Sequence, residues 1–150
     1  MITGYSIEQV LPHAHPMILL NEFIEADNVH ALCRVQISPQ SPFYDTALAG
    51  VPSYVGLEYM AQTIAAYAGA NNLAEGDKVQ IGFLLGCRKY VPSTTVFAVG
   101  TELTVRATQV VTDSSGLSVF DCQIYQQQQL LVDAKLNVFQ PDDHRSWLTE

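Results

Sequence analysis

One long apolar stretch, Gly50 to Ala70, constrains this chain more than any other part of its sequence. Its length is typical of a long helix, and Glu58 is its only charged residue. A helix that borders water normally carries a charged stripe, so a helix that is apolar on nearly every side belongs inside a domain. The stretch is also long enough to cross a membrane, but Glu58, Gln62 and its Gly and Pro residues argue against a span. We therefore predict a buried central helix over residues 50–70.

Glu58 stands on a narrow face of this helix whose other side chains are small or uncharged. That face consists of Ala61, Gln62, Ala65, Ala66 and Gly69, at helical spacing from the glutamate. Burying an ionised carboxylate is unfavourable unless the group has a partner or adjoins a polar cavity. Two interpretations follow: a glutamate hydrogen-bonded to neighbouring backbone, or a general acid or base set in a cleft.

The composition narrows the classes of partner. The chain has 150 residues, the size of one domain, so we assign residues 1–150 to a single domain. Its net charge of −8 disfavours nucleic acid and anionic membranes, which bind clustered Lys and Arg. Only 15% of residues are charged and 48% are hydrophobic. A surface so poor in charge is typical of a protein that is partly covered by another subunit or holds an apolar ligand.

The cysteines and histidines indicate neither disulfides nor a metal centre. Cys33, Cys87 and Cys122 are far apart and lack metal-ligand spacing, as expected of reduced thiols in a cytoplasmic protein. The sequence shows no signal peptide. His13 and His15 lack an acidic or cysteine partner at a spacing that would complete a metal site, so we expect no metal.

The first third of the chain reads as a short helix and a hairpin. Ser6 to Gln9 has the form of a capping box, which predicts a helix around residues 7–11 that Pro12 ends. Strands are predicted over 17–25 and 29–37, paired as an antiparallel hairpin. A loop over 38–49 leads into the central helix, with Pro52 in its first turn. We expect that helix to end between Gly69 and Asn72.

The remainder of the chain is predicted to be strands. Apolar or alternating segments cover 79–91, 96–111, 120–124 and 130–138, and the four glutamines 126–129 form a hairpin connection. A lone apolar helix needs cover on most of its surface. The sequence therefore predicts an α+β fold, a curved antiparallel sheet of about six strands around one long helix, with a second subunit covering part of the rest.

Several motifs in this order resemble the hot-dog-fold 3-hydroxyacyl-acyl-carrier-protein dehydratases of fatty-acid synthesis. The matching residues are Leu11-Pro12-His13, Pro16 to Leu20, Pro52 before Glu58, Met60-Ala61-Gln62 and Phe83 to Gly86. The segments Gly56-Leu57-Glu58, Leu84 to Arg88 and Asn137 to Pro141 are most similar to the branch found in aryl-polyene clusters.

The resemblance implies an activity and its partners. Such proteins form double hot-dog dimers, sometimes trimers of dimers, that convert carrier-bound 3-hydroxyacyl thioesters to trans-2-enoyl thioesters without a cofactor. A loop histidine removes the C2 proton, and a helix carboxylate of the partner protonates the leaving hydroxyl. Glu58 matches the carboxylate. Tyr44 stands where the family histidine is expected, and a tyrosine is a poor base at neutral pH.

The resemblance also implies substrate-binding residues. Gly86 lies near the position whose backbone N–H meets the thioester carbonyl. Arg88 and Lys89 either contact the phosphate of the pantetheine arm or form an ordinary solvated face. Tyr59, Met60, Phe83 and Leu85 are candidates for the wall of an acyl tunnel. Tyr44 is a candidate hydrogen-bond donor to the thioester or the hydroxyl.

The missing loop histidine leaves three interpretations open. His13 or His15 serves as the base, a different subunit supplies a histidine across a heterodimer interface, or the chain is a non-catalytic subunit that binds the carrier protein. A fourth possibility is an acyl thioesterase, because hot-dog folds also host thioester hydrolysis.

Overall fold

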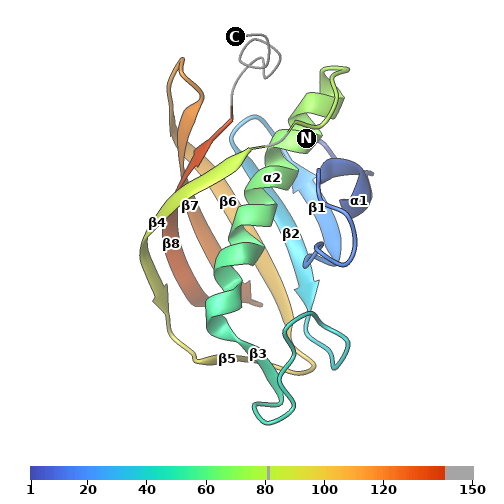
Figure 1. The fold of residues 1–150 in the computed structure, drawn as a ribbon, viewed down its shortest axis with the longest axis vertical. Coiled ribbons are helices and arrows are strands. Elements are labelled where there is room, and N and C mark those ends of the chain that lie inside the picture. The colour runs from blue at the N-terminus through green and yellow to red at the C-terminus, as the bar shows by residue number, and fades with distance from the viewer. Residues whose placement is uncertain (81, 141–150) are drawn as a thin grey trace.

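A six-stranded antiparallel sheet curls around one long helix in the computed structural model, which describes residues 1–80 and 82–140 (Figure 1). The elements in chain order are α1 (Ile7–Val10), β1 (Glu22–Ala26), β2 (His30–Gln36), β3 (Gly50–Pro52), the 3-10 turn η1 (Ser53–Val55), α2 (Gly56–Ala74), β4 (Phe83–Pro92), β5 (Val96–Ala98), β6 (Glu102–Thr112), β7 (Leu117–Gln126) and β8 (Gln129–Phe139). The sheet order is β1-β2-β6-β7-β8-β4. This arrangement is the hot-dog fold, and it confirms the predicted fold class.

The central helix begins and ends later than the sequence predicts. Residues 50–52 form β3, which pairs with β5, and α2 starts only at Gly56 after the turn η1. Gly50 packs directly on β5, because a Cβ there would lie 2.3 Å from the Phe97 carbonyl oxygen. Pro52 is therefore a strand residue and not the first turn of the helix. At the other end α2 continues to Ala74 and ends before Gly76, whose φ is +80°.

Helix α1 packs on the C-terminal half of α2 (Figure 1). The predicted capping box is present, with Ser6 and Gln9 each bonding to the backbone of the other. The two helices meet at Gly69, where a Cβ would lie 1.8 Å from the Val10 carbonyl oxygen. Only glycine allows this approach, so the backbone of α1 lies directly on α2.

The strands follow the predicted order, but several boundaries differ: β4 begins at Phe83 and not at residue 79, and β7 is longer than the predicted 120–124. The hairpin of β1 and β2 is confirmed, although β1 begins at Glu22, later than predicted. The predicted strand over 96–111 is two strands, because the chain turns at Gly100 (φ +88°) between β5 and β6. The glutamine run connects β7 to β8 as predicted, with Gln127 in a left-handed conformation (φ 56°).

The two edges of the sheet differ. Ile2 forms an isolated antiparallel bridge with Ala26 on the outer edge of β1. The opposite edge strand, β4, carries exposed Leu84, Leu85 and Val91, and in the described residues it pairs with β8 alone. An edge with unpaired backbone groups and exposed apolar side chains is suited to receive a further strand. In the part of the chain that the structure describes, no helix has the length and apolar character of a membrane span.

Candidate active site

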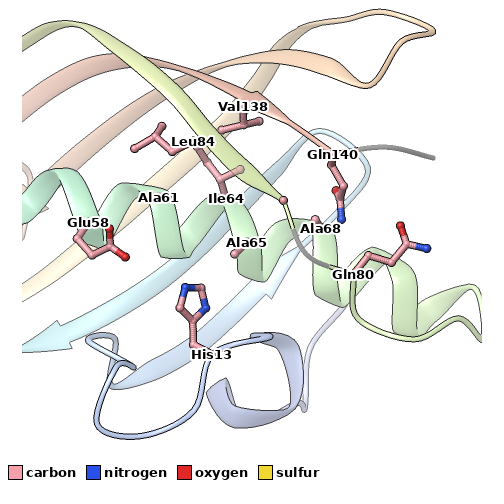
Figure 2. A pocket seen from close by; sticks show the side chains of 11 residues that line it. His13, Glu58, Ala61, Ile64, Ala65, Ala68, Gln80, Leu84, Val138 and Gln140 are labelled. Atoms are coloured by element: carbon pink, nitrogen blue, oxygen red, sulfur yellow. The ribbon is translucent and has the colours of Figure 1, made fainter. Parts of the chain in front are cut away.

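A cavity of about 200 Å³ runs alongside α2, between the loop that follows α1 and the ends of β4 and β8 (Figure 2). Its lining residues are His13, Glu58, Ala61, Ile64, Ala65, Ala68, Gln80, Gly82, Leu84, Val138 and Gln140. Most of the wall is therefore apolar. Ala61 and Ala65 come from the small-residue face predicted beside Glu58, whereas Ala68 was not part of that face. Ligand cavities are commonly about 300–1,000 Å³, so this one suits a slim chain more than a bulky ligand.

Glu58 lies in the first turn of α2, at one end of this cavity. Its carboxylate accepts a hydrogen bond from Gln62 Nε2 at 3.3 Å, one helical turn further along. The predicted burial of Glu58 is not found within one chain, because its side chain is exposed. The reason is that the sheet covers the opposite side of α2 and leaves the carboxyl group open to solvent.

Gln62 fixes the loop before β1 against α2. It is 1% exposed, and its Oε1 accepts from the Leu19 backbone N–H at 2.9 Å. Its Nε2 also donates to the Met17 carbonyl at 2.8 Å. The same side chain thus contacts the Glu58 carboxylate and anchors the segment that carries His13.

His13 lies on the same cavity as Glu58. Figure 2 shows its ring directed from the loop after α1 toward α2. The Nδ1 atom is buried and has no hydrogen-bond partner among residues 1–80 and 82–140. Either nitrogen of a neutral imidazole can carry the proton, so an unpartnered Nδ1 leaves the ring free to donate or to accept a hydrogen bond there. His15 lies elsewhere, exposed and 3.7 Å from the Glu8 carboxylate.

Two predicted aromatic site residues do not line this cavity. Tyr44 is half-buried against the core in the loop between β2 and β3, and its backbone N–H donates to the Ser41 carbonyl. Tyr59 is 1% exposed and stacks on Phe97, with ring centroids 6.0 Å apart. Burial raises the pKa of Tyr59 to about 12. Met60 is also fully buried. In the single chain these three side chains are apart from the Glu58 cavity, and their roles stay predictions.

The predicted substrate-binding residues of β4 lie on the open edge of the sheet. The register of β4 against β8 shifts between Leu84 and Gly86, so Gly86 follows a local irregularity of the strand. Arg88 and Lys89 are exposed further along. Phe83 begins β4, but its side chain lies outside the described residues, as does the end of the Asn137 to Pro141 motif beyond Gln140.

Sequence reasoning missed the far end of the cavity, where Gln80 and Gln140 lie. Gln80 belongs to no motif, Gln140 belongs to the Asn137 to Pro141 motif without having been assigned to the site, and the two residues are far apart in the chain. The curl of the sheet brings the start of β4 beside the end of β8, and periodicity does not indicate that approach. Within the described residues no three His, Cys, Asp or Glu side chains gather as a metal site.

The sequence matches a protein-family model described as ApeP-like, ApeP dehydratase, over residues 5–149. Among solved structures, a chain of the dehydratase heterocomplex ApeI:P from Xenorhabdus doucetiae is similar with a TM-score of 0.87, 26% identity and 97% of each chain covered. The PaaI protein of the E. coli phenylacetic acid degradation operon (TM-score 0.61, 16% identity, 79% of this chain and 81% of that chain covered) shares the fold. So does a hypothetical thioesterase with coenzyme A from Streptococcus pneumoniae (TM-score 0.62, 12% identity, 79% and 83% covered). No curated protein matches the sequence.

Proposed function

The chain belongs to the ApeP-like dehydratase family, and from that premise we propose that it dehydrates 3-hydroxyacyl thioesters on an acyl carrier protein to trans-2-enoyl thioesters, in fatty-acid or aryl-polyene synthesis. The observation that carries the proposal is that Glu58 and His13 line the same cavity, one carboxyl and one imidazole beside a stretch of alanine, isoleucine, leucine and valine side chains. A β-elimination of water needs this pair of groups, an acid and a base.

The reaction assigns one proton transfer to each group. His13 accepts the C2 proton, and the resulting negative charge spreads onto the thioester carbonyl. The backbone N–H of Gly86 is the candidate donor to that oxygen. Glu58 donates a proton to the C3 hydroxyl, the C3–O bond breaks, and water leaves as the C2–C3 double bond forms. Transfer of a proton from the imidazolium to the carboxylate, directly or through water, restores both groups.

The carrier protein brings the substrate on a phosphopantetheine arm. Arg88 and Lys89 are exposed neighbours on β4, in a chain with only seven basic residues and a net charge of −8. Two adjacent cations on an otherwise acidic protein are suited to hold one phosphate locally. We assign the phosphate of the arm to this position.

A second candidate function is that of a half-enzyme, in which another dehydratase chain supplies the base. Two observations favour it: the similar structure is a dehydratase heterocomplex, and β4 has an open edge with exposed apolar residues. Tyr44 stands at the position of the family histidine, and in this case an imidazole of the partner would act as the base in place of that missing histidine. Glu58 keeps its role as acid in both candidates.

One experiment separates the candidates. The purified chain, alone and mixed with a histidine-bearing hot-dog dehydratase, is incubated with a 3-hydroxyacyl carrier thioester, and the products are identified by mass spectrometry. Enoyl thioester from the chain alone supports His13 as the base. If the chain alone forms no enoyl thioester and the mixture forms it faster than the second dehydratase alone does, the result supports the half-enzyme. Free acid would mean hydrolysis and would contradict both, and no product in either case would leave only a carrier-binding role.

A further inference from the structure

The end of the cavity remote from Glu58 is polar. Gln80 and Gln140 lie there, past Ala68, whereas the wall between them and Glu58 is made, apart from His13, of alanine, isoleucine, leucine and valine side chains (Figure 2). From Glu58 to Ala68 the helix advances about 15 Å, at about 1.5 Å per residue. A chain lying along α2 with its reacting carbons at Glu58 therefore reaches the glutamines with its far end.

Both glutamines are held in place through their backbones. The Gln140 N–H donates to the Gly116 carbonyl at 3.0 Å, directly after β8. A Cβ on Gly116 would lie 2.3 Å from the Gln140 carbonyl oxygen, so glycine allows the two segments to meet. The Gln80 N–H donates to Asn72 Oδ1 at 3.3 Å, which ties the residue to the end of α2. The two side chains are thus presented from fixed positions.

The Gln140 amide has an unmet hydrogen-bonding capacity. Its Nε2 is buried and has no partner among residues 1–80 and 82–140, and it shares this state with His13 Nδ1 on the same cavity. Leaving a buried donor unpaired is unfavourable by about 1–3 kcal/mol, and native proteins rarely do so without a reason. A purely apolar chain end would leave this donor unpaired, whereas an oxygen at that end would accept from it.

We propose that the cavity selects acyl chains whose far end carries a hydroxyl or carbonyl oxygen, with Gln140 as donor to that oxygen and Gln80 beside it. The inference rests on the proposed function for the direction of the chain, because it places the thioester end at Glu58. It adds a substrate class, acyl chains with a polar tip, and two residues that determine specificity at a distance from the reacting carbons.

The test measures binding separately from turnover. The probes are 3-hydroxyacyl pantetheine amides, in which an amide replaces the thioester, with either a methyl group or a hydroxyl group at the far end. Calorimetry gives the dissociation constant of each for a series of chain lengths. The hydroxyl-ended probe is expected to bind about tenfold more tightly than its methyl-ended match, as one net hydrogen bond allows. The preference should appear only at lengths that span about 15 Å.

Variants assign the preference to the glutamines. Gln140→Met keeps the side-chain length and removes the amide, so the two probes should bind equally, and Gln80→Met should reduce the ratio. Gln129→Met, on the exposed β7–β8 hairpin, is the matched control and should keep the ratio of the unmodified chain. Equal binding of both probes to the unmodified chain, or a ratio unchanged in both cavity variants, would overturn the inference. Loss of enoyl formation with the preference intact would instead overturn the proposed function.

Discussion

Gln62 donates from its side-chain amide to the Glu58 carboxylate at 3.3 Å, while the same amide is bonded to the backbone of the loop before β1. The acid and the loop that carries His13 are therefore connected through one buried side chain. This connection explains why a polar residue occupies a fully buried position of an apolar helix. It also means that the orientation of Glu58 depends on how that loop is seated.

Glu58→Gln is expected to fold normally and to lose dehydration by about 10²- to 10⁴-fold, because the amide cannot donate the proton that the leaving hydroxyl needs. The measurement is the rate of enoyl formation from a 3-hydroxyacyl carrier thioester, with whichever partner the unmodified chain requires. Glu75→Gln, at the exposed far end of α2, serves as control and should retain the full rate. An unchanged rate in Glu58→Gln would remove this residue from the mechanism.

His13→Asn should lower the rate by about 10²- to 10⁴-fold if its ring is the base, because asparagine cannot accept the C2 proton. His15→Asn should have no effect, since that ring is exposed and lies beside Glu8. Tyr44→Phe tests whether the Tyr44 hydroxyl donates to the substrate. If His13→Asn retains activity only together with a second, histidine-bearing chain, the base belongs to the partner.

Gln62→Leu is expected to lower the free energy of unfolding by about 1–3 kcal/mol, because it leaves the buried Leu19 N–H unpaired. Urea denaturation followed by circular dichroism measures the change. Gln129→Leu makes the same substitution at an exposed position and should change stability little. Equal stability of both variants would show that the loop is held mainly by its apolar side chains.

Gly69→Ala should destabilise the fold, by about 1–3 kcal/mol, even though alanine is the better helix former by about 1 kcal/mol. The added Cβ would meet the Val10 carbonyl at 1.8 Å, so α1 and α2 must separate. Thermal unfolding measures the effect. Gly86→Ala is the steric control, because nothing lies within 4 Å of a Cβ at that position.

Cys87 should be the first of the three thiols to react with Ellman's reagent. Burial raises the pKa of Cys33 to about 12 and raises that of Cys122 further, so both stay protonated at pH 8, and both are 0% exposed. The pKa of Cys87 is also raised by burial, yet the residue is only half-buried. Because the thiolate reacts, its rate should increase with pH up to its raised pKa. Cys87→Ser should abolish the fast phase of the reaction. A second chain paired on β4 should protect the Cys87 thiol. Rapid labelling of Cys33 would contradict the expected order of reactivity.

The sequence predicted the architecture better than it predicted the site. The alternation of apolar and polar residues in β2 and the single charge of the 50–70 stretch were enough to predict a sheet and a buried helix. Such burial patterns can be recognised from residues that are close together in the sequence. The predicted start of α2 was wrong, because residues 50–52 pair with β5, and such a long-range contact is not visible in the local sequence. The cavity brings together His13, Glu58 and Gln140, whose approach depends on the packing of α1 and the curl of the sheet. Local patterns carry no information on such distances.

The unequal margins of the sheet set a limit on assembly. A strand from another molecule can be added along β4, whereas on the outer side of β1 the backbone of Ala26 is already hydrogen-bonded to Ile2. Two molecules joined along their β4 margins each use the edge that is suited to strand addition, which favours a closed pair over a fibre.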